Sequence, residues 1–368
     1  MIKCLGCNLM ILKKKTISKD KIRNILLIQL GDIGDVVLTF PAIRALKQNF
    51  PHAKIVVAVR EKARELIEDC RWADGVISVI KEKRTIPEEL FYHFRFFMVV
   101  RRYHFNLAAD MKMGDRGAIL ALCSGASQRV GFFAHDGMLW RNRVFNRLVL
   151  DEGYPGRHMA QYYLSLMASY GITTSDIWPE HIIPEKRMTQ ARKLLADEGV
   201  PSDRPMIALQ PFSLWKYKEW GIEKYIKLID WLVDTCHVSA IITGSHEERR
   251  QAEKITDTCK GHVYNLAGKT SIGVLPALFR KCKMFIGVDS AGMHIAAAIG
   301  LPTVSIFGPS STDDWAPRGK QHRFVCKNFS CVPCKNKGCN DSGISRCLNE
   351  LTLEEVQKAL EDHMKLFP

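Results

Sequence analysis

The stretch FIGVDSAGMHIAAAIGLPTVSIFGPS, residues 285–310, decides the fold class of this chain. Its pattern predicts a buried strand at Phe285–Val288, a tight turn, a helix of small apolar residues, and a second buried strand at Thr303–Phe307. Gly300 and Pro302 are typical of a helix that ends between the two strands. A strand, a helix and a second strand in this order predict an α/β protein with a parallel sheet.

The turn after the first of these strands has the chemistry of an anion site. Asp289 and Ser290 favour a helix N-cap, and the N–H groups of Ser290, Ala291 and Gly292 would point away from the strand's carboxyl end. The helix dipole adds partial positive charge there, so phosphate or diphosphate is the natural ligand. An ordinary capped helix in an α/β sheet explains the same residues, so the turn alone leaves both interpretations open.

Length and composition indicate a soluble protein of two domains. The chain has 368 residues, 46% of them hydrophobic, and a net charge of +14. No apolar run approaches the ~20 residues that span a bilayer. In the N-terminal segment MIKCLGCNLMILKKK the apolar stretch precedes the lysines, the reverse of a secretory signal, which predicts a frayed lead segment or a weak membrane anchor. Nucleic acid, an anionic membrane or a phosphorylated lipid acceptor would each suit the charge, but the sequence contains no nucleic-acid-binding motif.

Strands alternate with helices in two successive series. We expect a lead segment at 1–20, a Rossmann-like domain at 21–185, and a second at 186–368 that includes a Cys-rich segment, 326–347, and a C-terminal helix, 352–366. Besides those named above, the predicted strands are 24–30, 54–59, 75–79, 105–109, 206–210, 238–243 and 263–266. The predicted helices are 36–49, 64–68, 87–102, 118–123, 162–170, 189–198, 221–235, 247–258 and 272–280.

The first strand is followed by Gly31-Asp32-Ile33-Gly34-Asp35, which is not a dinucleotide fingerprint and argues against a nicotinamide enzyme. Asp35 stands at the start of a helix, beside glycines that leave space in front of its carboxylate. It is a candidate general base for a bound hydroxyl, and equally a helix N-cap.

In the second series, the loop QPFSLWKYKEW, residues 210–220, follows a strand at the edge where open α/β sheets bind ligands. Ser213 and Lys218 lie in it. Lys218 is a candidate to neutralise a departing diphosphate, or a solvated lysine among aromatic residues.

Two further loops and one histidine complete the candidates. Glu247, in TGSHEE, could accept hydrogen bonds from a ribose or be a first-turn helix acid. The loop NLAGKTS, residues 265–271, could frame a base. His294 could touch a phosphate or be a packed core residue.

These motifs together resemble a known family. ILLIQLGDIGDVVLTFPAIRALKQNFP, LQPFSLWKYKEW, TGSHEE, NLAGKTS and GVDSAGMHIAAAIGLPTVSIFGPS occur in the order and at the distances seen in the ADP-heptose lipopolysaccharide heptosyltransferases, family 9 glycosyltransferases of the GT-B fold. The resemblance extends from about Asn24 to the C-terminus.

The resemblance implies an α/β fold of GT-B type, with two Rossmann-like domains facing across a cleft. It implies an inverting transfer of heptose from ADP-heptose to the lipopolysaccharide inner core, with Asp35 as general base and Lys218 as the cation that assists the leaving group. The implied donor-binding residues are Ser213, Lys218, Glu247 (ribose), Thr270 (adenine), Asp289, Ser290, Ala291, Gly292 and His294, and those on the acceptor side are Gly31, Asp32 and Gly34.

The implied partners are the nucleotide sugar and a lipid-linked core oligosaccharide, with no cofactor, no catalytic metal and no nucleic acid. The implied location is cytoplasmic, peripheral at the inner face of the cytoplasmic membrane. Two alternatives remain open: a relative that uses a UDP- or GDP-linked sugar, and a non-catalytic basic module that binds nucleic acid or another polyanion.

Two further stretches have structural and functional interpretations. Cys331, Cys334, Cys339 and Cys347 have a first pair at zinc-knuckle spacing, which fits a structural metal site or reduced thiols. LFYHFRFFMVVRRYHF, residues 90–105, is typical of an amphipathic helix entering a strand, or of a surface for lipid or anionic sugar.

Overall fold

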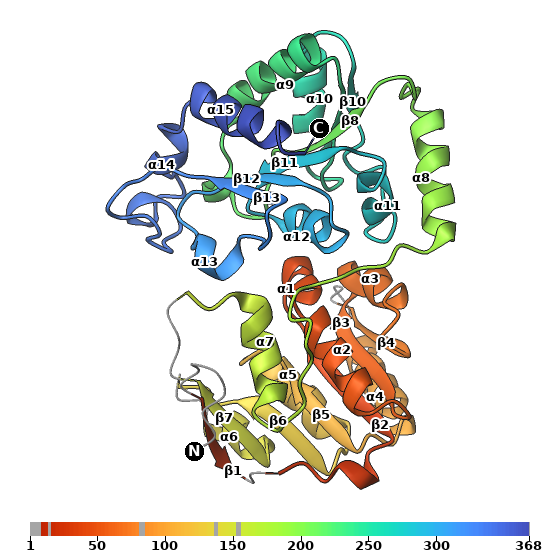
Figure 1. Ribbon diagram of the computed structural model, residues 1–368. Helices are drawn as coiled ribbons and strands as arrows, with labels where there is room; N and C mark the ends of the chain where they lie inside the picture. The colour runs from red at the N-terminus through yellow and green to blue at the C-terminus, as the bar shows by residue number, and fades with distance from the viewer. Residues whose placement is uncertain (1–8, 14–15, 81–84, 136–138, 152–155, 368) are drawn as a thin grey trace. The chain divides into compact units, whose positions relative to one another are not determined.

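The computed structural model describes residues 9–13, 16–80, 85–135, 139–151 and 156–367. The chain forms two compact units, Met1–Pro179 and Glu180–Pro368, whereas the sequence predicts a domain boundary between residues 185 and 186. Each unit contains its own sheet with helices packed on it (Figure 1).

The first unit is built on a seven-stranded sheet in the order β1-β7-β6-β5-β2-β3-β4. All neighbouring strands are parallel except β1 and β7, which pair antiparallel at the edge. The strands are β1 (Leu9–Lys13), β2 (Asn24–Gln29), β3 (Lys54–Arg60), β4 (Gly75–Val79), β5 (Leu107–Asp110), β6 (Gln128–Phe132) and β7 (Arg147–Asp151).

The helices of the first unit are α1 (Ile33–Leu38), α2 (Phe40–Asn49), α3 (Arg64–Glu68), α4 (Ile86–Arg102), α5 (Asp115–Cys123), α6 (Leu139–Val144) and α7 (Met159–Ala168). The single helix predicted up to Asn49 is wrong, because α1 ends and α2 begins at Thr39. Pro41 has no N–H with which to continue the hydrogen bonds of α1, but it suits the first turn of a new helix.

The second unit is built on a parallel sheet in the order β10-β9-β8-β11-β12-β13. Its strands are β8 (Met206–Gln210), β9 (Ser239–Ile242), β10 (Val263–Asn265), β11 (Met284–Val288), β12 (Thr303–Ile306) and β13 (His322–Val325). Its helices are α8 (Glu185–Asp197), α9 (Ile222–Cys236), α10 (Arg249–Thr258), α11 (Leu275–Phe279), α12 (Ala291–Ala298), α13 (Thr312–Trp315), α14 (Arg346–Asn349) and α15 (Leu353–Met364).

Each sheet is the centre of its unit's core. In the first unit Leu26 and Ile28 of β2 are fully buried, and in the second every residue of β11 is buried. The apolar runs that predicted these strands are therefore confirmed as strands covered on both faces, as parallel sheets require.

The sequence analysis did not predict several elements, namely β1, β6, β7, β13, α6, α13 and α14. The frayed lead segment is wrong for residues 9–13, since they form β1 against β7. Leu9 of β1 pairs with Asp151 of β7, which is far away in the sequence. A local sequence pattern therefore cannot predict this pairing.

Candidate active site

The carboxylate of Asp35 lies in the first turn of α1, beyond the carboxyl end of β2. Asp32 is the N-cap of this helix, and its backbone N–H donates to Asp35 Oδ2 at 2.9 Å as half of a capping box. The reading of Asp35 as the N-cap is therefore wrong, because the helix begins three residues earlier than that reading required.

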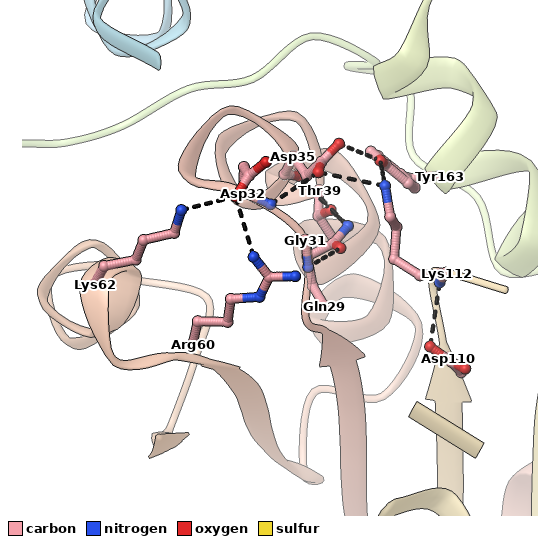
Figure 2. A network of polar contacts seen from close by, with 10 residues as sticks. All are labelled: Gln29, Gly31, Asp32, Asp35, Thr39, Arg60, Lys62, Asp110, Lys112 and Tyr163. Carbon is pink, nitrogen blue, oxygen red and sulfur yellow. Dashed lines mark hydrogen bonds and ion pairs between the residues drawn. The ribbon is translucent and has the colours of Figure 1, made fainter. Parts of the chain in front are cut away.

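Gly31 makes room for this carboxylate. A Cβ at position 31 would lie 2.2 Å from Asp35 Oδ2, so a side chain there would displace the carboxylate. The Gln29 side chain fixes the turn from below, because it accepts the Gly31 N–H at 3.2 Å and donates to Thr39 Oγ1 at 2.7 Å (Figure 2). Gly34 precedes Asp35 in α1 and has no side chain.

Two side chains from distant parts of the unit hold the same carboxylate. Tyr163, on α7, donates its hydroxyl to Asp35 Oδ1 at 2.6 Å, and Lys112 Nζ lies 3.3 Å from Oδ2 (Figure 2). Asp35 is 8% exposed. Burial and the negative charge of Asp35 raise the pKa of Tyr163 well above its usual range, so the phenol stays protonated and remains a donor.

Lys112 is itself held by a buried ion pair. Arg141 Nη2 lies 3.2 Å from Asp110 Oδ2 and donates to the backbone carbonyl of Lys112 at 2.7 Å. The Lys112 N–H donates to Asp110 Oδ1 at 3.1 Å. Burial raises the pKa of Asp110, and the charge of Arg141 opposes this effect. The pair fixes the backbone from which the Lys112 side chain reaches Asp35.

Asp32 faces two further cations. Its Oδ1 lies 2.7 Å from Lys62 Nζ and 3.1 Å from Arg60 Nη1, both at the end of β3 (Figure 2). Partial burial acts to raise the pKa of Asp32, but the hydrogen bond and charge of Lys62 and the charge of Arg60 hold it below its ordinary value. This edge of the sheet thus carries Asp32 and Asp35 with three cationic side chains around them.

In the second unit, Lys218 and Asp289 meet. Lys218 Nζ donates to Asp289 Oδ2 at 2.7 Å, and Asp289 is 5% exposed. The loop after β8 and the turn after β11 come together because these two strands are neighbours in the sheet. Asp289 therefore pairs with a lysine, and Ser290 occupies the N-cap position of α12 without a side-chain cap bond.

The start of α12 has features of a ligand site. The first N–H groups of a helix have no partner within it. A Cβ on Gly292 would lie 1.9 Å from Gln210 Oε1, so only glycine allows this approach. Among the described residues, neither Gln210 Oε1 nor Ser290 Oγ has a hydrogen-bond partner, although both atoms are buried. Ala291 follows with a minimal side chain.

Ser213 is fixed in the loop that carries Lys218. Its backbone N–H donates to Glu219 Oε1 at 3.0 Å, and its hydroxyl accepts from the Trp215 N–H at 3.3 Å. The carboxylate of Glu219 also pairs with Lys216 at 2.9 Å. Ser213 is 6% exposed, so the loop presents Lys218 from a rigid base.

The loops after β9 and β10 also meet, because these strands are neighbours. The Gly268 N–H donates to the Gly244 carbonyl at 2.9 Å. Glu247 lies in a turn before α10, which begins at Arg249, so the first-turn interpretation is wrong. Bonds from its own backbone N–H and from Ser245 lower the pKa of Glu247. Thr270 is half-buried in the second loop.

His294 is buried in α12, and its ring lies 6.1 Å from that of Trp315 between centroids. This packing agrees with the core interpretation.

The cysteine cluster lies together in the second unit. One cavity of about 300 Å³ is lined by Cys331, Cys334, Cys339 and Cys347. In the described ranges, no three His, Cys, Asp or Glu side chains are grouped so as to hold a metal ion.

Sequence reasoning missed Tyr163, Lys112, Arg60 and Lys62. Lys62 and Lys112 follow the carboxyl ends of β3 and β5, the two neighbours of β2, so the strand order would have found them. Tyr163 carries no such signal, since it lies within a helix of apolar periodicity.

Comparisons with known proteins agree with this architecture. The model of glycosyltransferase family 9 (heptosyltransferase) matches residues 93–344. Lipooligosaccharide heptosyltransferase 2 of Campylobacter jejuni is 35% identical over 88% of this chain and 94% of its own length. Lipopolysaccharide heptosyltransferase 3 of Escherichia coli K12 is 27% identical over 91% of this chain and 95% of its own length. The solved E. coli ADP-heptose lipopolysaccharide heptosyltransferase II has a TM-score of 0.77 at 21% identity, covering 93% of this chain and 99% of that one.

The two parallel-sheet units and these matches define a glycosyltransferase of the GT-B fold. The chain belongs to glycosyltransferase family 9, the heptosyltransferases. Across the described ranges, its helices are too short or too polar to cross a bilayer.

Proposed function

We propose that this enzyme transfers heptose from ADP-heptose to the inner core of lipopolysaccharide, with inversion at the anomeric carbon. The observation that carries the proposal is the carboxylate of Asp35, held by Tyr163, Lys112 and the Asp32 N–H at the end of β2. A carboxylate fixed in this way is preorganised to accept a proton.

Asp35 is the proposed general base. As the acceptor hydroxyl oxygen attacks the anomeric carbon, its proton passes to the Asp35 carboxylate and the bond from carbon to the diphosphate oxygen breaks. Tyr163 and Lys112 orient the carboxylate and do not themselves take the proton. ADP leaves with the electron pair of the broken bond.

The second unit supplies the proposed donor site. Lys218 and the N–H groups of Ser290, Ala291 and Gly292 stabilise the charge that develops on the leaving diphosphate. The buried unpartnered oxygen of Ser290 supports a ligand at this turn. The remaining donor roles are Ser213 at the diphosphate, Glu247 at the ribose, Thr270 near the adenine, and Asp289 and His294 in the pocket wall. These contacts require no metal and no cofactor.

The acceptor side would be recognised by charge. Arg60 and Lys62 lie at the end of β3 and pair with Asp32, and Lys112 lies at the end of β5. Gly31 and Gly34 leave room near Asp35 for a sugar. An inner core that carries phosphate or carboxylate groups complements these cations, as it complements the net charge of +14. We therefore place the enzyme in the cytoplasm, at the inner face of the cytoplasmic membrane, with a lipid-linked core oligosaccharide as its acceptor and no nucleic acid as partner.

The test is to incubate the purified protein with ADP-heptose and an inner-core acceptor and to follow ADP release. Thermal shift against ADP, UDP and GDP tests the donor separately, because a nucleotide at 100 times its dissociation constant adds about 2.7 kcal/mol of stability. Stabilisation by UDP or GDP alone, with turnover of the matching sugar, would refute the ADP-heptose assignment. Salt-sensitive binding of oligonucleotides without any nucleotide response would refute the enzymatic proposal.

A further inference from the structure

Helix α4 presents an apolar surface that the described residues leave uncovered. Ile86, Leu90, Phe91 and Phe94 each expose between 62% and 79% of their surface. Val100 is the helix's one buried residue. This surface, completed by the half-exposed Phe97 and Met98, is called the α4 outer face.

The α4 outer face is distinct from the side of the helix that packs on the sheet. At 3.6 residues per turn, its six apolar residues fall within an arc of about 140°. Val100, Phe96 and Tyr103, which contact the core of the unit, fall within about 60° on the other side of the helix. The helix therefore has two apolar faces, and the core accounts for only one of them.

Exposed arginines accompany the outer face. The Arg95 guanidinium lies 5.7 Å from the centroid of the Phe91 ring, and that of Arg101 lies 5.9 Å from the Phe97 ring. Arg102 lies on the same edge as Arg95, since seven residues make about two turns. The Arg101 guanidinium also lies against Gly125, where a Cβ would be 1.7 Å from Nη1, so Arg95 and Arg102 are the arginines that face outward. Exposed arginines beside aromatic rings are suited to an interface between an apolar phase and anionic groups.

The acidic residues of α4 lie at its first turn and are engaged locally. Glu88 accepts from the Thr85 N–H at 2.8 Å in a capping box. Glu89 Oε1 lies 3.0 Å from His93 Nε2. The α4 outer face is thus apolar and basic.

We propose that the α4 outer face binds the surface of a membrane that contains anionic lipids. Aromatic and aliphatic side chains would enter the boundary between head groups and acyl chains, while Arg95 and Arg102 pair with lipid phosphates. A second copy of this chain fits less well, because a symmetric contact would bring the arginines of both copies together. The inference rests on the proposed function, since it names how an enzyme with a lipid-linked acceptor reaches the membrane.

The test is sedimentation with vesicles of phosphatidylcholine mixed with phosphatidylglycerol, and with phosphatidylcholine alone, without nucleotide sugar. Phe91→Ser/Phe94→Ser should weaken binding to the mixed vesicles by about tenfold or more. Arg95→Gln/Arg102→Gln should weaken it by about 25-fold, or roughly fivefold per arginine, and leave binding to phosphatidylcholine alone nearly unchanged. The control is Ile344→Ser, at a side chain of the second unit that is 61% exposed, and it should bind as the wild type does.

These outcomes are separable from the chemistry. Turnover on a delipidated core oligosaccharide should be the same for the wild type and the α4 variants, because none of the substituted residues lies at the candidate active site. If the wild type and the variants all fail to turn over the delipidated acceptor while vesicle binding is intact, the proposed function is wrong. The proposal that the α4 outer face binds membranes would still stand. The membrane proposal is overturned if the wild type fails to bind the mixed vesicles, or if the Phe91/Phe94 variant binds them equally. It is also overturned if sedimentation velocity finds a dimer that this variant abolishes.

Discussion

Replacing Asp35 with Asn removes one negative charge and leaves the shape of the side chain. The amide oxygen can stay in the place of Oδ2 and accept from the Asp32 N–H, now 2.9 Å away. The amide NH2 then faces Tyr163, whose hydroxyl rotates from donor to acceptor. What is lost is the ion pair with Lys112, whose side chain is 40% exposed. A pair this open to solvent contributes little, so the free energy of unfolding should fall by about 1 kcal/mol or less.

The effect on turnover should be much larger. An amide cannot accept the hydroxyl proton, so the rate should fall by roughly 10²–10⁴, the usual contribution of a positioned base. ADP affinity should stay near wild type, because the proposed diphosphate contacts all belong to the second unit. Melting temperature, ADP binding and ADP release on Asp35→Asn give the three measurements.

Tyr163→Phe is the companion variant. It removes one donor to Asp35 but keeps the carboxylate, so turnover should fall by only about tenfold, a loss of positioning. If Asp35→Asn turns over at nearly the wild-type rate, Asp35 serves only as the partner of the N-cap Asp32 in the capping box, and our mechanism is wrong. If Tyr163→Phe loses as much activity as Asp35→Asn, the phenol takes part in the chemistry and the roles given above are reversed.

Three further predictions concern other positions. Lys218→Ala should lower turnover by about two to three orders of magnitude, since the leaving diphosphate loses its cation. An unchanged rate of ADP release would mean that Lys218 serves only as the counter-ion of Asp289. Gly31→Ala should lower turnover by about tenfold or more, because the new Cβ would lie 2.2 Å from Asp35 Oδ2. The control is Gly114→Ala, whose Cβ would meet no atom within 4 Å. Equal turnover rates for the two variants would contradict this prediction. Burial lowers the pKa of His322 to about 4, so the unfolded chain takes up a proton at higher pH than the folded chain does, and the free energy of unfolding should fall as the pH drops from about 6.5 to 4. Urea unfolding of His322→Gln should show a pH dependence weaker by about 3 kcal/mol over that range, and parallel curves for the two proteins would argue against it.

The strands at the centre of each sheet were predictable because they are buried on both faces. The run of buried residues in β2 and β11 matches the apolar runs of the sequence, and Asp35, Lys218 and Asp289 could be proposed as candidates because each follows a predicted strand. Their contacts were not predictable. Lys218 follows β8 and Asp289 follows β11. The two residues meet only because β8 and β11 are neighbours in the sheet, although β9 and β10 lie between them in the sequence.

The misses have a related cause. Tyr163 reaches Asp35 from α7, 128 residues away, and helical periodicity does not distinguish a tyrosine that packs from one that donates to a carboxylate. Lys112 depends on the adjacency of β2 and β5. The edge strand β1 depends on an antiparallel partner near the end of the unit's sheet. Each miss is a long-range contact, whereas local patterns specify only elements.

The ion pair between Lys218 and Asp289 makes the Asp289 carboxylate a competitor for any anion that binds Lys218. A ligand that recruits Lys218 exchanges with a carboxylate 2.7 Å from the ammonium group instead of meeting an unshielded charge. A small anion that offers a single contact gains little from that exchange, whereas a ligand that also engages the start of α12 has further contacts to offset it. At the proposed donor site the pair would thus set a minimum affinity, and inorganic phosphate, with few contacts to offer, would rarely displace Asp289 and block the site.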